Sequence, residues 1–233
     1  MNILLTGASR GIGAATFDLL KSRGHNVVGH STKGGNGLIA GDLMDPGAPS
    51  AIWEEALVRL DGRIDALVNN AGIFEAADIA GTEEEWQASW RRTMQINLHA
   101  PADLCRHAVN HFRHSGGGRI VNVASRASWR GDSPLHWHYA ASKSGMIGMT
   151  KSIARAYAAD GVLAFAVAPG FTVSEMTEEY LQGRGGAQVV ADIPLGRVAS
   201  TVEVAEVIRW LATEAPASST GTTVDVNGAS YVR

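Results

Sequence analysis

Several features that mark specialised proteins are scarce in this sequence of 233 residues. Its single cysteine, Cys105, excludes an intrachain disulfide framework. No apolar stretch reaches the roughly 18 residues that a membrane-spanning helix requires. Charged residues make up 18% of the chain and the net charge is −3 at pH 7, so the basic excess that favours non-specific nucleic-acid binding is missing.

The N-terminal segment 1–7 also lacks the basic region and the cleavage signature of a secretory signal peptide. We therefore expect a cytoplasmic protein. What the chain does contain is 45% hydrophobic residues, an ordinary value for a globular protein. Because there is no internal repeat, linker or low-complexity tract, we expect residues 1–233 to form a single α/β domain with a large core.

A glycine-rich loop between a strand and a helix is the first chemical signal. The apolar run 2–5 predicts a buried strand, and the pattern of 14–23 predicts a helix. Glycines between them permit a tight turn and a close approach to a pyrophosphate, which the helix N-terminus then attracts. The spacing G-x3-G-x-G also fits a purely structural turn. Our interpretation is a dinucleotide site whose contacts are Gly7, Ser9, Arg10, Gly11, Ile12 and Gly13.

The end of the second strand indicates which dinucleotide binds. This strand, 25–29, is followed by His30, Ser31, Thr32 and Lys33, with no acid to hold a ribose 2′-hydroxyl. Arg10 is a second cation beside Lys33. Two cations together with the hydroxyls of Ser31 and Thr32 suit a 2′-phosphate. We therefore predict NADP(H) over NAD(H). The alternative is that Lys33 is merely solvated and either cofactor binds.

Two further strand ends complete the predicted cofactor site. Three glycines in 31–37 argue against a helix between the second strand and a short third strand at 38–41. Asp42 and Leu43 follow that strand, and Asp42 could accept a hydrogen bond from an adenine amino group or simply form a turn. A buried strand at 64–68 ends in Asn69, Asn70, Ala71 and Gly72, where small residues let the backbone approach a ligand.

A long helical segment, 82–114, follows. Thr82 and Glu85 predict a capping box at its start. Asn97 is unfavourable inside a helix on propensity, so we expect it to have a specific role. Three histidines follow at helical spacing and could form a metal-binding face. Because no acidic or cysteine partner lies nearby, we predict no metal there. These histidines are His107, His111 and His114.

Tyr139 and Lys143 carry the clearest catalytic signal. A strand at 119–125 ends in the hydroxyl of Ser125, and after a loop a helix is predicted at 139–160. Tyr139 and Lys143 lie one turn apart on the same face of this helix. A nearby ammonium favours the phenolate, so we expect Lys143 to lower the pKa of Tyr139 and make it a general acid or base. An exposed cation–aromatic contact would be the purely structural interpretation.

The remaining elements complete the fold prediction. A strand at 162–168 ends in Pro169-Gly170, 171–193 reads as a substrate lid, and a last strand is expected at 222–226. Thr201 is predicted to cap a helix at 201–212 without a reciprocal capping box, because Val204 lies three residues on. Alternating strands and helices predict a Rossmann-type, doubly wound parallel sheet of about seven strands, which binds ligands at the carboxyl ends of its strands.

Together these motifs resemble the short-chain dehydrogenase/reductase family, and within its main branch are similar to the 3-oxoacyl thioester reductases. Residues 6–13 look like its cofactor loop and 69–72 like its strand-4 motif. Tyr139 lies one residue further from Ser125 than is usual, so we expect an insertion in this loop. Pro169 and Gly170 match the nicotinamide-side turn, after which Thr172 and Ser174 would contact the cofactor. The resemblance implies a catalytic tetrad of Asn97, Ser125, Tyr139 and Lys143.

The resemblance implies reversible hydride transfer between NADP(H) and a ketone or aldehyde, giving a secondary or primary alcohol. Tyr139 would give the proton, Ser125 would orient the carbonyl, and Lys143 would lower the tyrosine pKa and hold the nicotinamide ribose. Asn97 would position a water. A dimer or tetramer is also implied, because the helix that carries Tyr139 continues with apolar residues on several faces through 146–157.

Substrate identity is weakly encoded. Loops at 74–79, 127–138 and 171–190 should line the pocket, with Trp129, Leu135, Trp137, Met176 and Tyr180 making it apolar and aromatic. His136 and His138 would orient a polar group or be solvated. We expect a hydrophobic or cyclic ketone, with a 3-oxoacyl thioester as the runner-up. The same fold also allows a catalytically silent cofactor-binding protein, since fold alone does not fix function, and a related epimerase or dehydratase.

Overall fold

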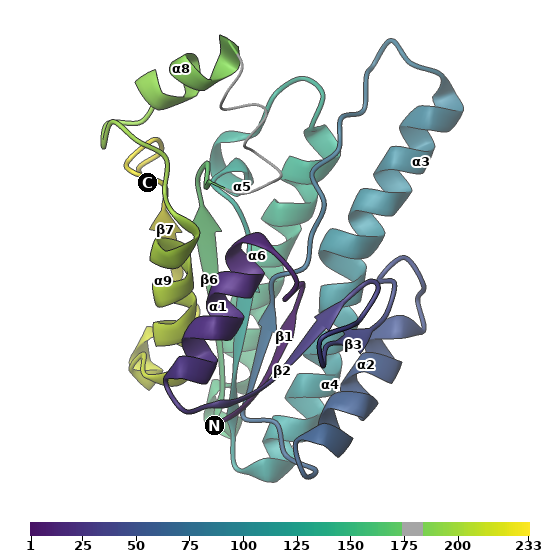
Figure 1. Ribbon diagram of the computed structural model, residues 1–233, viewed down its shortest axis with the longest axis vertical. Coiled ribbons are helices and arrows are strands. Elements are labelled where there is room, and N and C mark those ends of the chain that lie inside the picture. Colours follow the sequence, from purple (N-terminus) through teal and green to yellow (C-terminus); the bar gives the residue numbers. More distant parts are fainter. Residues whose placement is uncertain (174–183) are drawn as a thin grey trace.

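A computed structural model of the chain describes residues 1–173 and 184–233 (Figure 1). In this part of the chain seven strands form one sheet in the order β3-β2-β1-β4-β5-β6-β7, and every neighbouring pair is parallel. The doubly wound parallel sheet predicted from the sequence is therefore confirmed. The strands are β1 (Asn2–Thr6), β2 (Asn26–Ser31), β3 (Ile39–Ala40), β4 (Ala66–Asn69), β5 (Gly118–Val123), β6 (Val162–Pro169) and β7 (Thr223–Val226).

Helices cover both faces of the sheet, and the burial of β1 shows why its sequence is continuously apolar. Leu4 packs in one core cluster with α2 (Ala48–Arg59) and α4 (Ala100–Ser115). Ile3 and Leu5 point to the opposite face, where α1 (Gly11–Ser22) and α9 (Thr201–Thr213) lie side by side (Figure 1). Since successive strand residues alternate between two buried faces, both sets must be hydrophobic.

The connection between β2 and β3 contains no helix, as predicted. Gly34, Gly35, Asn36 and Gly37 have φ angles of 66°, 86°, 51° and 82°. A run of positive φ angles is incompatible with a right-handed helix, and glycine is the residue that adopts them at least cost. The chain therefore turns straight into β3, which is shorter than the predicted 38–41.

The long helical segment is divided by a π-helical turn. Helix α3 (Glu83–Met94) begins with the predicted capping box, in which Thr82 and Glu85 bond reciprocally. The π-helical turn η1 (Gln95–His99) then joins α3 to α4, which ends at Gly116 with φ of 86°. π-turns inside helices are rare and often lie at functional sites, and this one holds Asn97.

Two helix starts differ from the prediction. Helix α9 is capped by Ser200, not Thr201: the Ser200 Oγ accepts from Glu203 N at 3.2 Å and the Glu203 carboxylate accepts from Ser200 N at 2.8 Å. The prediction of Thr201 without a capping box was wrong, because the box is complete one residue earlier. Helix α6 (Trp137–Tyr157) begins two residues before Tyr139.

The other short elements lie around these. A single helical turn, α5 (Ala127–Arg130), occupies the loop after β5, and α8 (Arg184–Ala191) precedes α9. Two 3₁₀ turns, η2 (Ala158–Asp160) and η3 (Ala217–Ser219), precede β6 and β7. No helix in residues 1–173 and 184–233 combines the length and apolarity of a membrane span.

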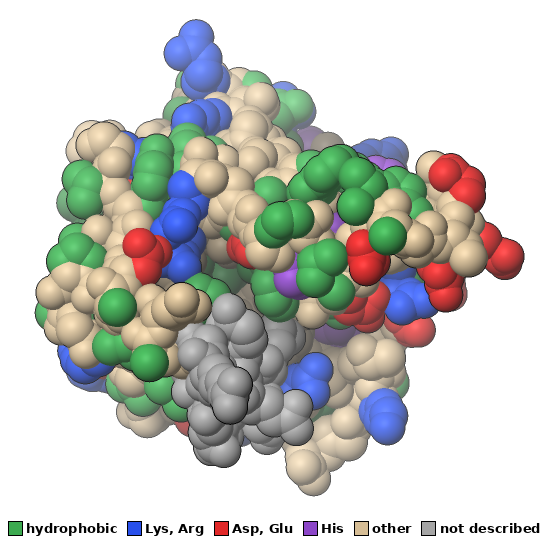
Figure 2. Space-filling model, turned by 90° about the horizontal axis from the view of Figure 1, so that it is seen from above, with side chains coloured by type: hydrophobic (Ala, Val, Ile, Leu, Met, Phe, Trp, Pro, Cys, Tyr) green, Lys and Arg blue, Asp and Glu red, His purple; other side chains and the backbone are tan. Residues whose placement is uncertain are grey.

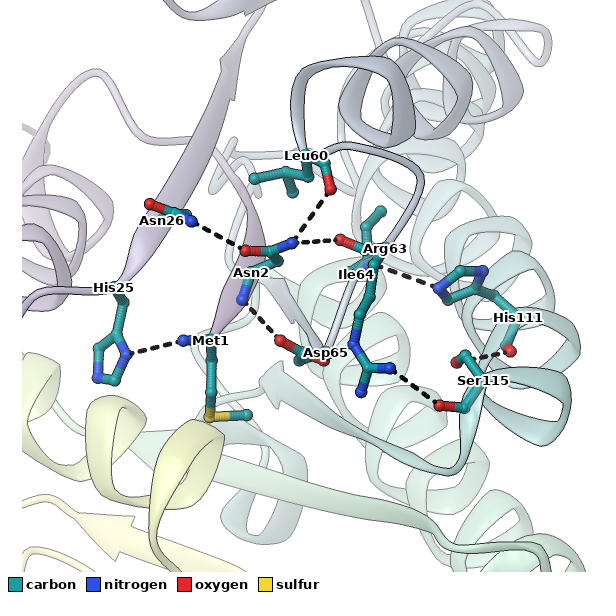
Figure 3. A network of polar contacts seen from close by, with 10 residues as sticks. All are labelled: Met1, Asn2, His25, Asn26, Leu60, Arg63, Ile64, Asp65, His111 and Ser115. Atoms are coloured by element: carbon teal, nitrogen blue, oxygen red, sulfur yellow. Dashed lines mark hydrogen bonds and ion pairs between the residues drawn. The ribbon is translucent and has the colours of Figure 1, made fainter.

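A polar network fixes the edge of the sheet at which the strands begin (Figure 3). The Asn2 side-chain amide donates to Leu60 O at 3.1 Å and Arg63 O at 2.9 Å, and its backbone N–H donates to the Asp65 carboxylate at 2.8 Å. His111 Nε2 accepts from Ile64 N at 3.2 Å in the same network. The start of β1 is thereby tied to the loop before β4.

Candidate active site

The strands end at the opposite edge of the sheet (Figure 1). Residues at these strand ends line a pocket of about 340 Å³. Seen from above, this face carries hydrophobic, basic and acidic side chains close together (Figure 2). Ser174 lies outside the described residues. The predicted cofactor contacts that line the pocket are Gly7, Ser9, Arg10, Gly11, Ile12, Gly13, His30, Ser31, Asp42, Leu43, Asn70, Ala71, Gly72, Tyr139, Lys143, Pro169, Gly170 and Thr172.

Close backbone packing explains the glycines of the first loop. Gly7 has φ of 69°, and a Cβ on Gly13 would lie 1.9 Å from Gly7 O. Arg10 is the N-cap of α1 but its side chain makes no capping hydrogen bond. The first N–H groups of the helix therefore face the pocket without a side-chain acceptor, which is the arrangement that binds a phosphate.

Asn70 braces this loop from the neighbouring strand. Its Nδ2 donates to Thr6 O at 3.0 Å and to Gly7 O at 3.1 Å. The Thr6 hydroxyl in turn accepts from the backbone N–H of Asn70 and of Ala71, both at 3.1 Å. The 69–72 motif therefore holds the glycine loop in shape from within the protein.

The residues near the predicted ribose edge differ in accessibility. Arg10 is exposed and lines the pocket, whereas Lys33 is exposed and is not among the lining residues. His30 is buried, with Nε2 2.8 Å from Gly41 O, and burial lowers its pKa, so it is neutral at pH 7. Asp42 Oδ1 accepts from Met44 N at 3.0 Å, which is the turn geometry that its position after β3 also allowed.

Asn97 is fully buried and does not line the pocket. Its Oδ1 accepts from Ile73 N at 2.8 Å, and its Nδ2 donates to Ile73 O at 2.9 Å and to the Ser142 hydroxyl at 3.3 Å. One side chain thus pairs with both backbone groups of Ile73, as a neighbouring strand would. This fixes the loop after β4 against α6.

Tyr139 and Lys143 both reach the pocket, but the electrostatics differ from the prediction. Lys143 Nζ donates to Val123 O at 2.8 Å and lies 5.9 Å from the Tyr139 ring centroid. Burial raises the pKa of Tyr139 to about 12, and the hydroxyl of Ser125 only partly opposes this. Burial also lowers the pKa of Lys143 to about 8. The predicted lowering of the tyrosine pKa by Lys143 is therefore wrong for this structure, because desolvation raises the pKa and Asp132 raises it further.

Ser125 and Tyr139 line one pocket despite the longer loop between them. The Ser125 Oγ accepts from Ala127 N at 3.1 Å, at the start of α5. This helical turn was not predicted, and it takes up part of the loop. It is followed by Gly131 with φ of 77°, which turns the chain back toward α6.

Three residues predicted to line the substrate wall lie outside the pocket in the described part of the chain. Trp129 does not line the pocket and packs under the charges of Lys151 and Arg233, 5.0 and 4.7 Å from its ring. Trp137 and Leu135 are 48% and 37% exposed and do not line it either. Met176 and Tyr180 lie outside the described residues. Among the described residues the aromatic lining comes from Phe74, Tyr139 and Phe171.

The two histidines of this loop have protein partners. His136 stacks on Phe74 with 3.9 Å between ring centroids. His138 is buried, with Nε2 3.0 Å from the Ser89 hydroxyl. Sequence reasoning missed two charged pocket residues, Arg126 and Asp132. The position of Arg126 directly after Ser125 was the available signal.

The three histidines of α4 point to separate partners. His107 Nε2 lies 3.0 Å from the Ser50 hydroxyl, His111 accepts from Ile64 N, and His114 Nδ1 lies 2.7 Å from Asn110 O. Among the described residues no group of three or more potential metal ligands converges.

Known proteins similar to this chain match it over nearly its full length. The family model described as Enoyl-(Acyl carrier protein) reductase matches residues 7–229. The 3-oxoacyl-(acyl-carrier-protein) reductase FabG of Vibrio cholerae is 36% identical over 241 residues, which cover 98% of this chain and 96% of that protein. The cis-4-hydroxycyclohexanecarboxylate dehydrogenase of Sinomonas cyclohexanicum is 35% identical over 239 residues, 97% of this chain and 94% of that protein.

Among solved structures, the ligand-free aldohexose dehydrogenase of Thermoplasma acidophilum superposes with a TM-score of 0.87. It is 27% identical in sequence, and the match covers 99% of this chain and 94% of that one.

Proposed function

We propose that the protein reduces a hydrophobic or cyclic ketone reversibly with NADP(H). The chain belongs to the short-chain dehydrogenase/reductase family and is an oxidoreductase acting on carbonyl or CH–OH groups. The observation that carries the proposal is a single pocket lined by the glycine loop together with Ser125, Tyr139 and Lys143. The pocket therefore brings together the cofactor loop, the proposed proton donor and the hydroxyl that would orient the carbonyl, as hydride transfer requires.

The residues of the pocket fit a nicotinamide dinucleotide. The close packing of Gly13 on Gly7 fixes the shape of the loop, and the start of α1, which has no side-chain cap, offers N–H donors for a pyrophosphate. Bound there, NADPH would supply the hydride. Arg10, exposed at the rim and without an ion pair in the described part of the chain, is our candidate for a 2′-phosphate contact. This supports NADP(H) over NAD(H).

In the proposed mechanism Tyr139 is the general acid of carbonyl reduction. With a pKa of about 12 its hydroxyl is protonated at neutral pH and able to donate to the oxyanion that forms on the substrate. Ser125 donates a hydrogen bond to the same oxygen and orients it. The ammonium of Lys143 stabilises the phenolate that Tyr139 becomes, since the charge appears only as the proton leaves.

We assign Asn97 a positioning role. Its side chain is occupied by Ile73 and Ser142, so it acts by fixing the loop that forms one wall of the pocket. We further propose that 171–193 serves as a lid over the single domain. Phe171 and Thr172 line the pocket in support of this; residues 174–183 lie outside the described structure.

Assembly and location are also proposals. The apolar residues of α6 that suggested a partner subunit are largely buried within one chain, with Met146, Ile147 and Ile153 at 0%, 3% and 9% exposed. The proposed dimer or tetramer therefore rests on family membership. A cytoplasmic location is likewise proposed, and the single cysteine, Cys105, provides no intrachain disulfide that would argue against it.

The test is oxidation of NADPH, followed by absorbance, with a panel of cyclic ketones. Replacing Tyr139→Phe removes the proton but keeps the ring, and should reduce turnover by about 10²- to 10⁴-fold. Tyr157→Phe, at the far end of the same helix, is the matched control and should retain turnover. Full activity of the Tyr139→Phe enzyme would refute the proposed role.

A second candidate is the reduction of a 3-oxoacyl thioester. It is favoured by the 36% identity to the Vibrio cholerae 3-oxoacyl-(acyl-carrier-protein) reductase. Acetoacetyl thioesters in the same assay distinguish the two candidates by their kcat/KM values. A cyclic hydroxy acid, as named for the Sinomonas cyclohexanicum dehydrogenase, belongs to the first candidate class.

A further inference from the structure

Arg126 places a cation in the pocket that the proposed chemistry leaves unused. It lines the pocket directly after Ser125, and its side chain is only 12% exposed. Its backbone N–H donates to Pro169 O at 2.9 Å, which fixes the residue between the ends of β5 and β6. Its guanidinium lies 4.8 Å from the centroid of the Phe171 ring, another lining residue.

The guanidinium of Arg126 has no hydrogen-bond acceptor among the residues that the structure describes. Its Nη1 is buried and makes no hydrogen bond within the described ranges. Its one ion-pair contact in the described ranges is with Asp192 Oδ2 at 3.8 Å, too far for a hydrogen bond. That carboxylate is 54% exposed and is bonded instead to Arg130 Nη1 at 2.8 Å.

Arg119 is a partly buried arginine with a structural role, and its hydrogen bonds can be compared with those of Arg126. Its Nη1 donates to Leu211 O at 3.0 Å and its Nη2 to Ala215 O at 2.8 Å, so its donors hold α9 against the sheet. Arg126 makes no comparable bond within residues 1–173 and 184–233. A buried donor without an acceptor is costly to the folded protein, and the cost is removed when an acceptor arrives.

The charged groups around Arg126 do not fully neutralise its guanidinium, so a further anion can bind. Arg130 repels it, while Asp192 and Asp132 attract it, and both of these acids are exposed to solvent. Water screens exposed charges, so they offset the buried guanidinium only in part. The planar fork of a guanidinium matches the two oxygens of a carboxylate.

We propose that Arg126 binds a carboxylate of the substrate, so that this enzyme interconverts an oxo acid and a hydroxy acid. The inference rests on the proposed function and names its substrate class. Because Arg126 and Ser125 are consecutive and line one pocket, one substrate molecule reaches both the carboxylate site and the proton donor. Esters and thioesters of the same acids lack the anion and bind more weakly.

The experiment compares 4-oxocyclohexanecarboxylate with its methyl ester, using NADPH and the full-length protein. Wild type should show a KM for the acid at least about 10-fold below that for the ester, since a charge-assisted bidentate bond is lost in the ester. Arg126→Gln should raise the KM for the acid by about 10- to 100-fold and leave the ester unchanged. Asp192→Asn should lower the KM for the acid, because it removes the competing carboxylate.

Arg113→Gln serves as the matched control. It also removes one arginine of an ion pair, here with Asp160, at a site outside the pocket, and should leave both KM values unchanged. Equal KM values for acid and ester in wild type, or an Arg126→Gln enzyme with an unchanged KM for the acid, would overturn the inference while leaving the reductase function intact.

Two further measurements separate the inference from the proposed function. If NADPH is not oxidised with any ketone, the proposed function fails. If the Arg126→Gln variant does not fold, the binding of an inhibitor to the wild-type protein is measured in place of the turnover of the variant. Cyclohexanecarboxylate should then protect wild type against thermal unfolding in the presence of NADPH, and cyclohexylmethanol should not; equal protection would overturn the assignment.

Discussion

Replacing Gly13 by alanine should destabilise the protein and weaken cofactor binding together. On helix propensity alone, alanine in place of glycine would stabilise a helix by roughly 0.5–1 kcal/mol. At Gly13 the added Cβ would lie 1.9 Å from Gly7 O, where ordinary contacts begin at 3.4 Å. The obstacle is backbone, so it cannot rotate away as a side chain would, and Asn70 Nδ2, which donates to Gly7 O, would itself lie 2.5 Å from the added Cβ.

Relieving this contact requires the glycine loop or the start of α1 to move. Overpacking costs of about 1–3 kcal/mol are typical of buried sites, and a backbone obstacle places Gly13→Ala at the upper end. For a chain of this length we expect the melting temperature to fall by roughly 4–10 °C. The same movement displaces the N–H groups at the start of α1, so the Kd for NADPH should rise by more than about 10-fold.

Gly148→Ala is the matched control, because it makes the same chemical change inside helix α6. A Cβ there would have no atom within 4 Å, and its φ is not positive. It should therefore raise stability by roughly 0.5–1 kcal/mol and leave NADPH binding unchanged. Calorimetry and fluorescence titration measure both quantities. If Gly13→Ala melts at or above wild type and binds NADPH equally well, the packing argument is refuted.

Three further changes test other parts of the site and fold. Arg10→Ser should raise the KM for NADPH by about 10- to 100-fold and leave that for NADH nearly unchanged; equal effects on both cofactors would reject the 2′-phosphate contact. Since the pKa of Lys143 is lowered to about 8, its cationic fraction falls as the pH rises through that value, and kcat/KM for reduction should fall with it; a rate that is flat from about pH 7 to 9.5 would count against the role of Lys143. Ser200→Ala should cost about 1 kcal/mol in urea unfolding, against less than about 0.5 kcal/mol for Thr201→Ala; the reverse order would contradict the observed cap.

Patterns local in sequence were the ones that predicted structure well. The three glycines within 31–37 predicted a missing helix because their backbone conformation follows from residue type. The capping box of Thr82 and Glu85 was likewise confirmed, since its partners are three residues apart. The cap at Ser200 was missed because both Ser200 and Thr201 carry a hydroxyl, and only the position of Glu203 separates them.

Properties set by distant residues could not be predicted in the same way. The direction of the Tyr139 pKa shift is set by burial, which outweighs the opposing hydrogen bond of Ser125. Trp129 was assigned to the pocket from its loop, but the unpredicted turn α5 packs it beside Lys151 and Arg233. That Arg126 Nη1 has no hydrogen-bond acceptor in the described part of the chain becomes visible only when its neighbours in space are known.

The network at Asn2 also constrains the order in which the chain can fold during its synthesis. Strand β1 lies in the middle of the sheet, between β2 and β4, and its first residue bonds to Leu60, Arg63 and Asp65. Contacts that span this much sequence form slowly, because the intervening loop must close first. The first strand to leave the ribosome therefore waits, apolar and unpaired on one side, until β4 has been translated. During that interval the unpaired edge of β1 makes the growing chain prone to aggregation.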